Sequence, residues 1–425
     1  MVIVTTSTGL GSPGIANVFN GSGDELLTQA LLGNGPLGVT LNTTGTEATT
    51  ANSDGTINSY EPSTTLESYE VQVSTLLQPA QPINLLPTTD YLFVTEPNVS
   101  AVSVLSGTSG NYQFFEQIPV APSPINFAGN SGGARIYAIS QDNGSHKVAF
   151  GDCETPSQVT SPGQAVSIET ASITISGTFP VGICPVYGLT STDNNRTYVL
   201  NRGSGTITVI NSQLNQLDNT PNVRNLNPAT GTLTLPPPAG FTGASFNAGP
   251  VFADFYPIAS QLVTANYDSN TISIVNVSLD EFGNDSSLFG KTVTVPVGNG
   301  PAAVTILRDG SRAYVANQKD GTVSVVNLTT FQVQATIPVT GHPTSIASIF
   351  STPYGQVFVT SPDQPYMTVI RTDTDEVEAK IELDGNGIDV HTSVQYAGLT
   401  NANSVVESHA SGSGAPCGLG AVCTR

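Results

Sequence analysis

Basic residues are scarce in this chain. Only 12 of its 425 residues are Lys or Arg, against 32 that are Asp or Glu, and the formal net charge is −20. A surface with this potential repels the phosphates of nucleic acids and of anionic lipids. We therefore expect no nucleic-acid partner and no binding to a membrane surface.

Long apolar runs are also missing. No stretch of 18 apolar residues occurs, so the sequence predicts no membrane-spanning helix and no membrane insertion. Residues 1–5 lack the basic start and the long apolar stretch of a signal peptide. If the protein is exported, we expect its targeting segment to be already absent from this numbering.

Charged residues of both signs make up only 10% of the chain, so its polar surface must consist mainly of Ser, Thr, Asn, Gln and Gly. Average proteins carry more than twice that share of charged residues. The composition favours an extracellular or cell-surface location over a cytosolic one.

The four cysteines form two pairs that are close in sequence, Cys153 with Cys184 and Cys417 with Cys423. Three connectivities are possible, and we predict the local one because its loops are short. Disulfides favour oxidising compartments, and four reduced, buried thiols are the alternative. The spacing of Cys417 and Cys423, with no histidine nearby, fits neither a zinc site nor haem attachment.

Seven segments of the chain share one pattern: an extended apolar run ends at a small or polar residue, and a turn and a second alternating run follow. The first runs end 44 to 65 residues apart, at Asn52, Glu96, Ser140, Asn201, Asn266, Asn317 and Ser361. A proline lies 14 to 18 residues before each of these positions, at Pro36, Pro82, Pro124, Pro185, Pro250, Pro301 and Pro343. Two such regularities indicate an array of one supersecondary unit.

The repeat that begins at Pro301 contains four short runs. Their apolar residues alternate with period two, and Asp309-Gly310 and Asp320-Gly321 separate them as turns. These features predict short antiparallel strands, and radial arrays of four-stranded units form propellers. We predict an all-β chain: a β-propeller of four-stranded antiparallel blades with seven complete repeats over residues 36–385.

The repeats resemble a known family. Tyr-Val-Ala-Asn at 314–317, Tyr-Val-Leu-Asn at 198–201 and Thr-Val-Ser-Val-Val-Asn at 322–327 are similar to the YVTN family of bacterial and archaeal β-propeller repeats, and the likeness extends over residues 15–385. It implies a propeller, often of seven blades, and frequently a secreted or surface location, but no activity. The absence of tryptophan argues against WD-type and quinoprotein propellers, whose blades use a Trp docking motif.

Both ends of the chain hold surplus half-repeats. Residues 15–20 and 24–32 match a third and a fourth strand, whereas 387–394 and 396–401 match a first and a second. Closure of the ring by both ends would give an eighth, composite blade. The alternatives are seven blades with extensions at 1–35 and 386–425, and pairing of the surplus strands with a second copy.

The strand after each repeat proline should line the central channel, where propeller enzymes gather their polar groups. Among those seven segments only Asp254 carries a charge. The histidines share no ligand spacing, at His146, His342, His391 and His409. The sequence therefore predicts no catalytic, metal-binding or cofactor-binding residue and no cofactor.

We accordingly expect a non-catalytic extracellular or cell-surface propeller with a structural or interaction role. It would assemble with itself through its terminal strands or long loops, or bind another surface protein or a glycan. A secreted or periplasmic lactonase-like hydrolase using Asp254 with His391 or His342 is the alternative, and a carbohydrate or protein receptor is a third.

Two stretches exceed the repeat, 153–180 and 212–248. They are expected to follow corresponding strands of adjacent blades and to emerge close together. Long loops on a rigid scaffold commonly carry binding, and solvated decoration is the other interpretation.

Overall fold

The computed structural model describes residues 1–9, 12–42, 45–62, 68–72, 81–107, 111–129, 132–219, 226–256, 258–349 and 354–392, with backbone only at 68–72. In these ranges the only regular elements besides strands are three 3-10 turns, η1 Pro97–Val99, η2 Asp152–Glu154 and η3 Pro156–Gln158. None of the described helices is long and apolar enough to cross a membrane.

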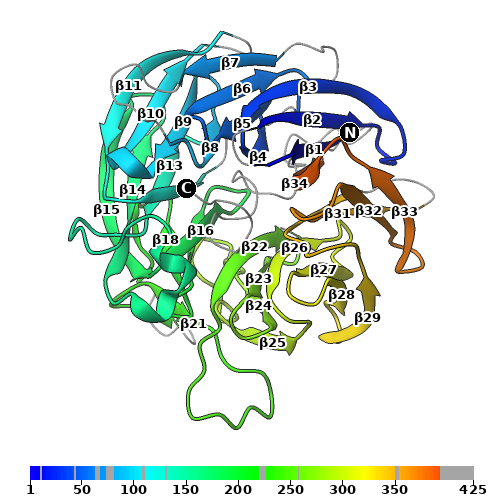
Figure 1. Cartoon of the computed structure of the whole chain (residues 1–425). Coiled ribbons are helices and arrows are strands. Elements are labelled where there is room, and N and C mark those ends of the chain that lie inside the picture. The colour runs from blue at the N-terminus through cyan, green and yellow to red at the C-terminus, as the bar shows by residue number, and fades with distance from the viewer. Residues whose placement is uncertain are drawn as a thin grey trace.

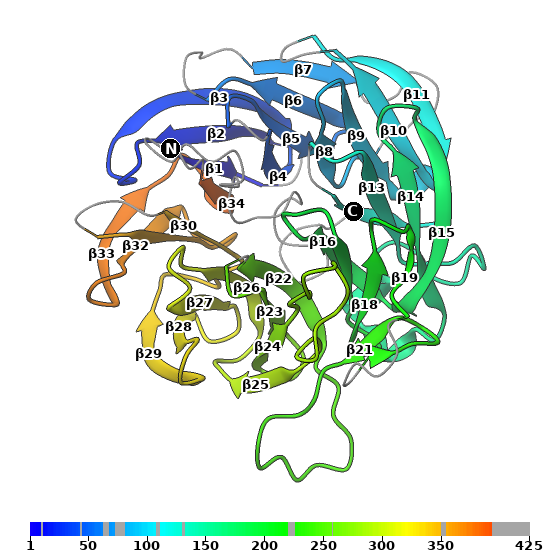
Figure 2. The ribbon, with the colours of Figure 1, turned by 180° about the vertical axis from the view of Figure 1, so that it is seen from behind.

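Eight antiparallel sheets stand radially around a central axis as the blades of a β-propeller (Figures 1 and 2). Seven blades follow the sequence repeats in chain order, as predicted, and we number them 1 to 7. The eighth, the composite blade, joins the two ends of the chain. The innermost strands contact one another in the ring order β34, β4, β8, β12, β16, β22, β26, β30 and back to β34.

Blade 1 contains β4 Pro36–Leu41, β5 Ala48–Asn52, β6 Thr56–Tyr60 and β7 Ser68–Gln72. Blade 2 contains β8 Leu85–Pro87, β9 Tyr91–Glu96, β10 Ala101–Ser106 and β11 Gln113–Pro119. Blade 3 contains β12 Pro124–Ala128, β13 Arg135–Ser140, β14 Pro162–Glu169 and β15 Thr174–Ile183. Blade 4 contains β16 Pro185–Thr190, β17 Arg196–Asn201, β18 Thr206–Asn211, β19 Gln216–Leu217, β20 Leu226–Asn227 and β21 Thr232–Thr234. Blade 4 thus replaces the single outer strand by three short ones.

Blade 5 contains β22 Pro250–Tyr256, β23 Gln261–Asn266, β24 Thr271–Asn276 and β25 Thr292–Pro296. Blade 6 contains β26 Pro301–Ile306, β27 Arg312–Asn317, β28 Thr322–Asn327 and β29 Gln332–Pro338. Blade 7 contains β30 Ser345–Ile349, β31 Gln356–Thr360, β32 Tyr366–Arg371 and β33 Glu376–Glu382. The composite blade contains β34 Asn386–Thr392, β1 Val2–Ser7, β2 Pro13–Phe19 and β3 Leu26–Asn34, from the axis outward.

The repeated asparagine ties the central hairpin of a blade. Asn317 ends β27, and its Nδ2 donates to Thr322 Oγ1 at 3.0 Å and to Ser324 Oγ at 2.9 Å on β28. Asn201 and Asn266 make the same pair of bonds to the residues five and seven positions later. The recurring Asn-to-Thr spacing in the sequence therefore encodes a side-chain brace across the turn in these three blades.

The repeat prolines begin the innermost strands. In five repeats the residue just before the proline has a positive φ, at Gly35, Ser123, Cys184, Gly249 and Gly300. This left-handed residue turns the chain from the outer edge of one blade to the axis of the next, and glycine adopts it without a steric penalty. Proline then fixes its own φ at the start of the strand.

The two ends of the chain close the ring, but the number of strands that each end contributes differs from the prediction. The second strand of the composite blade is β1, which pairs with β34 so that Val4 faces Val390, and with β2 so that Val4 faces Asn17. The sequence interpretation took residues 396–401 as this strand; they lie outside the described residues. The N-terminal end therefore supplies three strands and the C-terminal end a single strand, and the seven-bladed alternative is wrong.

Successive side chains of β1 point to opposite faces of the composite blade, and this explains why the strand completes the ring. All six of its residues are buried. Val2 and Val4 pack with Phe358 of blade 7, whereas Ile3 packs with Val39 and with Tyr60 of blade 1. Opposite faces of the strand thus fill the cores on both sides of the composite blade.

The two long stretches do not follow corresponding strands, contrary to the prediction. Residues 162–169 and 174–183 are the regular strands β14 and β15, and the extra residues of blade 3 lie before them, at 141–161. In blade 4 the additional residues follow the third strand, β18. The sequence prediction placed β14 and β15 in a long loop because the insertion moves both strands further from β13 than the repeat spacing leads one to expect.

Candidate functional site

The hub of the propeller, where its innermost strands meet, is the candidate functional site. Four side chains there accept a hydrogen bond from a backbone N–H of the next blade in the ring. The pairs are Asn84 Oδ1 with Phe127 at 3.1 Å, Asn126 Oδ1 with Gly188 at 2.9 Å, Asp254 Oδ2 with Ile306 at 2.8 Å, and Asp389 Oδ2 with Val39 at 3.1 Å. An innermost strand has an unpaired edge toward the axis, and these acceptors satisfy some of its donors.

Asp254 lies on β22, as the sequence predicted, and is almost completely buried. Its Oδ1 accepts the N–H of Phe255 at 2.8 Å, and its Oδ2 accepts the N–H of Ile306 in blade 6. Oδ2 therefore links β22 to the innermost strand of blade 6, while Oδ1 binds the backbone of its own strand.

Asp389 on β34 is the second hub carboxylate, and the sequence prediction overlooked it. Its Oδ1 accepts from Ser345 Oγ of blade 7 at 2.6 Å, while its Oδ2 accepts from Val39 N–H of blade 1. It thus links the composite blade to both neighbours. Burial raises the pKa of Asp389, and the nearby imidazole of His391 and the hydrogen bonds counter this rise.

His391 follows two residues later on the same strand. Burial lowers the pKa of its imidazole, and the charge of Asp389 opposes that shift. Since the pKa falls from an already near-neutral value, the ring is predominantly neutral at pH 7.

Tyr187 on β16 extends the polar hub across the axis, because blade 4 stands opposite the composite blade in the ring order. The side chain is fully buried, and its ring lies 4.7 Å from that of Phe252. Its hydroxyl has no hydrogen-bond partner among the described residues. Burial, with added repulsion from Asp254 and Asp389, raises its pKa far above neutrality, so the phenol stays protonated.

The structure brings Asp254 and His391 to the innermost strands, but not His342. That residue is exposed and pairs with Asp363, with 2.7 Å between Nδ1 and Oδ2. In the described ranges no three His, Cys, Asp or Glu side chains gather in a way that could hold a metal ion. His409 lies outside those ranges.

The Cys153–Cys184 disulfide is present, with 5.4 Å between the Cα atoms. It joins η2, in the inserted segment of blade 3, to the residue that precedes β16 of blade 4. The guanidinium of Arg202 donates to Cys153 O at 3.1 Å and holds the same segment. Cys417 and Cys423 lie outside the described residues.

A second buried charge cluster lies away from the hub, between blades 4 and 5. Arg196, which is 1% exposed, donates to Asp218 Oδ2 at 2.7 Å and to Asp285 Oδ1 at 2.8 Å. Burial and the charge of Asp218 raise the pKa of Asp285 to about 6, against the pull of Arg196. The cluster holds the 277–290 connection of blade 5 against blade 4.

Residues 235–249, which we name the arm, connect β21 to β22 and project beyond the rim of the ring (Figure 1). The ends of the arm are fixed, since Leu235 and Ala248 are buried. Most of the residues between them are exposed, and they form no strand or helix. The arm belongs to the longer stretch at 212–248 that the sequence marks as excess.

No protein-family model and no curated protein sequence matches the chain. Solved structures do resemble it. AztD from Citrobacter koseri superposes with a TM-score of 0.59 at 10% identity, over 92% of this chain and 96% of AztD. Sqt1 from Saccharomyces cerevisiae gives 0.60 at 10% identity, over 86% of this chain and 91% of Sqt1.

The dihydro-heme d1 dehydrogenase NirN in complex with DHE gives a TM-score of 0.51 at 14% identity, over 75% of this chain and 57% of NirN. At such identities the likeness shows a common propeller fold alone.

Proposed function

We propose that this chain is a non-catalytic, extracellular or cell-surface β-propeller that serves as a structural and interaction module, and that it belongs to the YVTN type. Its association with other molecules, including copies of itself, would use surfaces outside the hub. Blade closure occupies β34 and β1 to β3, so the proposal assigns self-association to a long loop rather than to the terminal strands.

The main support for a non-catalytic role is the hydrogen bonding of the hub carboxylates. Asp254 and Asp389 each accept hydrogen bonds with both oxygens, and the donors include backbone N–H groups of neighbouring innermost strands. A general base or a metal ligand needs a lone pair directed at a substrate or ion. Carboxylates engaged in this way are suited to holding blades together.

Two further observations support the location and the family type. The Cys153–Cys184 disulfide is of the kind that persists in oxidising compartments. The brace made by Asn201, Asn266 and Asn317 gives a physical role to the last residue of the Tyr-Val-x-Asn motif on which the YVTN resemblance rests.

A hydrolase of the lactonase kind is the second candidate, and one observation favours it. Asp254, Asp389 and His391 come to the innermost strands, and the buried hydroxyl of Tyr187 faces the same hub without a described hydrogen-bond partner. His391 could serve as a general base because burial keeps its imidazole neutral.

A lactone-hydrolysis assay separates the two candidates. The intact protein is incubated with aliphatic and aromatic lactones, with Ca²⁺, Mn²⁺ or Zn²⁺ added and after chelation. We expect turnover equal to the buffer blank in every case. Metal-dependent turnover that His391→Ala abolishes in a folded protein would establish the hydrolase instead. A glycan array tests the receptor alternative, for which we expect no binding.

A further inference from the structure

Blade 2 departs from the pattern that braces the hairpins of other blades. In blades 4, 5 and 6 an asparagine ends the second strand, and its Nδ2 donates to hydroxyl groups of the third. In blade 1 Asn52 Nδ2 donates to Thr56 Oγ1 at 3.1 Å and to Asn58 Oδ1 at 2.7 Å. Blade 2 has Glu96 at this position, at the end of β9. A carboxylate accepts hydrogen bonds but donates none, so it cannot replace the amide unless it holds a proton.

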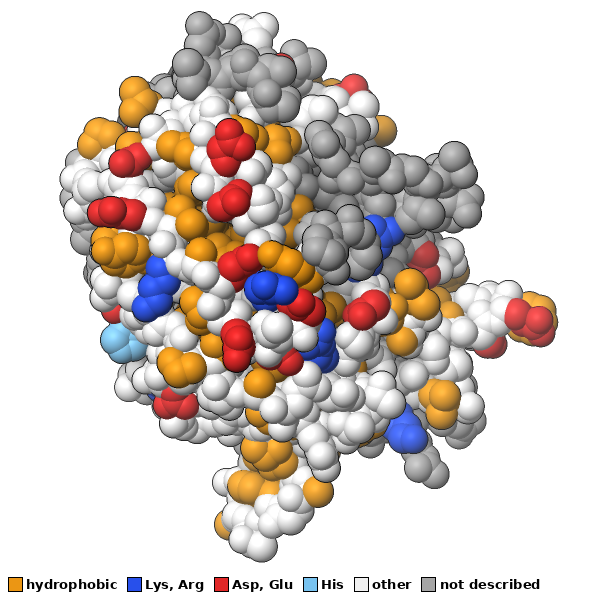
Figure 3. Space-filling model, turned by 90° about the vertical axis from the view of Figure 1, so that its right-hand side faces the viewer, with side chains coloured by type: hydrophobic (Ala, Val, Ile, Leu, Met, Phe, Trp, Pro, Cys, Tyr) orange, Lys and Arg blue, Asp and Glu red, His pale blue; other side chains and the backbone are white. Residues whose placement is uncertain are grey.

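The side chain of Glu96 is completely buried, at 0% exposure. Carboxylates (red) also reach the surface of the molecule, some of them beside Lys or Arg (blue), on the face that Figure 3 shows. Leu92 and Val94 point to the same side of β9 as Glu96 and pack with Ala51 and Ile57 of blade 1. Glu96 therefore lies at an apolar interface between two blades, where a negative charge is costly.

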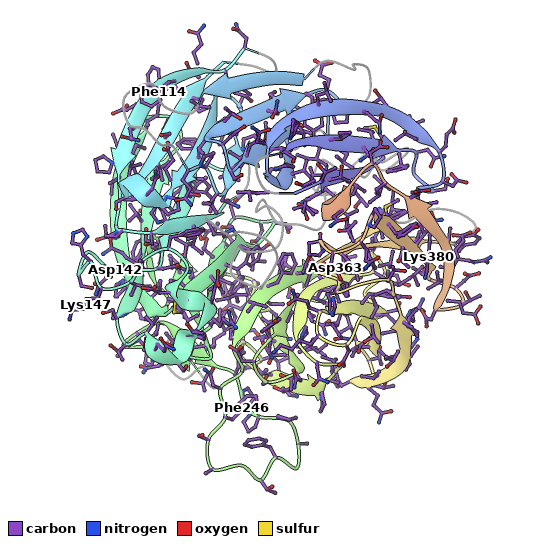
Figure 4. The ribbon with its side chains drawn as sticks, viewed as in Figure 1. Phe114, Asp142, Lys147, Phe246, Asp363 and Lys380 are labelled. Carbon is purple, nitrogen blue, oxygen red and sulfur yellow. A yellow bond between two sulfur atoms is a disulfide. The ribbon has the colours of Figure 1, made fainter. Side chains whose placement is uncertain are left out.

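Glu96 has a single hydrogen-bond partner among the described residues. Ser103 Oγ, seven positions later on β10, donates to Glu96 Oε1, and Gln117 Nε2 of β11 donates to the same hydroxyl at 3.3 Å. The position five residues after Glu96, a threonine in blades 4 to 6, is Ala101, and Glu96 Oε2 has no described partner. The bonds link three strands of blade 2, out to β11, which carries Phe114 at the outer rim (Figure 4).

Other buried carboxylates have partners that suit a negative charge. Arg196 neutralises the cluster between blades 4 and 5, and Asp254 and Asp389 accept backbone N–H groups. Asp142 accepts the backbone N–H groups of residues 144 and 146–148. Glu96 contacts neither a cation nor a backbone N–H in the described part of the chain, so a proton is the remaining way to remove its charge.

Glu47 of blade 1 is the other buried carboxylate of the described ranges that has hydroxyl partners only, from Ser59 and Tyr112. It differs from Glu96 because it does not occupy the brace position, which in blade 1 is Asn52. The comparison singles out Glu96 as the place where a carboxyl group stands for an amide.

No described charge near Glu96 opposes its protonation. The innermost strands β4, β8 and β12 and the strands β5 and β10 contain no titratable residue. The titratable residues elsewhere around Glu96 are Tyr91 on β9, Tyr60 on β6, Glu116 on β11, Tyr112 before β11, Asp54 before β6 and Glu47 before β5. None of them shifts the pKa of Glu96, which burial raises and the bond from Ser103 lowers.

We propose that Glu96 is a proton-operated brace, which ties β9 to β10 while it holds a proton and lets blade 2 loosen when the proton leaves. The protonated carboxyl group is neutral and has an O–H to donate, so it satisfies burial and replaces the asparagine amide. The anion is left with one hydroxyl partner, which favours opening of the hairpin to water. This inference does not depend on the proposed interaction role, and it makes the acidity of the surroundings a regulator of blade 2.

The direction of the effect follows from proton linkage. The folded state holds the proton of Glu96 more tightly than the open state does, because burial raises the folded pKa. The stabilisation is therefore complete below the pKa of an exposed glutamate, about 4.3, and is lost as the pH rises through the folded pKa. Within this window one proton changes the opening equilibrium by up to about tenfold per pH unit.

Hydrogen exchange of the intact protein between about pH 4 and pH 8 tests the proposal, with rates corrected for the pH dependence of unstructured peptides. We expect the protection of residues 101–106 and 113–119 to fall by up to about tenfold per pH unit, and that of 322–327, braced by Asn317, to stay constant. Glu96→Gln should abolish the fall, because its amide donates at every pH. Glu116→Gln is the matched control, since Glu116 is exposed on the same blade, and it should behave like the wild type.

Urea denaturation separates this role from a purely structural one. Glu96→Gln should raise the midpoint above that of the wild type near about pH 8 but not near about pH 4, whereas loss of a structural contact would lower it at both. Glu96→Asn, which carries the residue of the other blades, is a second neutral variant if the glutamine variant does not fold.

Three results would overturn the proposal: wild-type protection of blade 2 that does not change with pH, the same change in Glu96→Gln as in the wild type, or a Glu96→Gln midpoint below the wild type at both pH values. None of them bears on the lactone assay or on association. Failure of this inference is therefore distinct from failure of the proposed function.

Discussion

From the sequence, both the terminal strands and the 212–248 stretch, which contains most of the arm, were candidates for interaction elements, yet they take opposite places in the molecule. Residues 2–7 and 386–392 become the inner pair of strands of the composite blade, with every residue of β1 buried. The arm stays outside the ring, mostly exposed. The comparison shows that a surplus segment joins the core when it can bury the side chains of both its faces and pair its backbone on both sides.

Backbone chemistry accounts for the difference. The VIVTTS segment offers an N–H and a C=O at every position and pairs on both sides, with β34 and β2. The arm has three consecutive prolines, which lack an N–H, and three glycines. It can therefore neither extend the sheet of blade 4 nor fold as a strand of its own.

Truncation of the N-terminal strands should have the largest effect on stability, and it tests the difference between the terminal strands and the arm. Removal of residues 1–34 deletes three strands of the composite blade and exposes the apolar faces of blades 1 and 7. We expect the truncated chain to lose cooperative thermal unfolding. Replacement of 237–245 by Gly and Ser residues of the same number is the control, and it should leave the Tm unchanged. A truncated protein with the wild-type Tm would contradict closure by the chain ends.

The disulfide offers the next largest effect. Cys153 and Cys184 are 31 residues apart, and a loop of this size contributes about 3 to 4 kcal/mol to the free energy of unfolding on the loop-entropy account. We expect the Cys153→Ser/Cys184→Ser variant to lose about this amount in urea denaturation. Reductant should destabilise the wild type but not the variant, and equal effects on both would argue against a structural bond.

The hub carboxylates should have a smaller effect. In Asp389→Asn the amide nitrogen cannot accept, so one of the bonds from Ser345 or Val39 is lost. We expect the free energy of unfolding to fall by about 1 to 3 kcal/mol, and by a similar amount for Asp254→Asn. Asp90→Asn changes an exposed carboxylate and serves as the control. If all three variants match the wild type, the hub carboxylates do not hold the blades, and the basis of the non-catalytic assignment is lost.

The pH dependence of the Arg196 cluster gives the smallest effect. Because the folded pKa of Asp285 is raised to about 6, the folded state binds its proton more tightly than the unfolded state does. This contribution to stability is complete below the unfolded pKa and is lost as the pH rises through 6. Asp285→Asn should flatten the change in unfolding free energy between about pH 4 and pH 7. An unchanged slope would mean that Asp285 is not the titrating group.

Much of the fold could be predicted from the sequence, because repetition makes local signals agree. The ends of β5, β9, β13, β17, β23 and β27 fall at the predicted marker residues, from Asn52 to Asn317. Period-two alternation and Asp-Gly turns were sufficient for these strands. Residues 2–7 gave no comparable signal, since only Val2, Ile3 and Val4 are apolar and a segment without its partner strand does not reveal where it pairs.

The candidate site was predicted less completely. Asp254 could be placed in the hub because it follows a repeat proline. Asp389 belongs to a strand with no such proline, and its role depends on Ser345 and Val39, which come from two blades distant in sequence. Only the position of residues 387–394 as a possible first strand pointed to it. Contacts made by ring closure cannot be inferred from any one repeat.

Hydrogen exchange measured by mass spectrometry tests the central claim most directly, because it compares both regions in one unmodified sample. The account predicts that the amides of 2–7 and 386–392 exchange as slowly as those of β27, while those of 239–245 exchange at nearly the rate of an unstructured peptide. Exchange of 2–7 and 386–392 as fast as that of 239–245 would contradict the claim that the chain ends close the ring and leave the arm to make contacts.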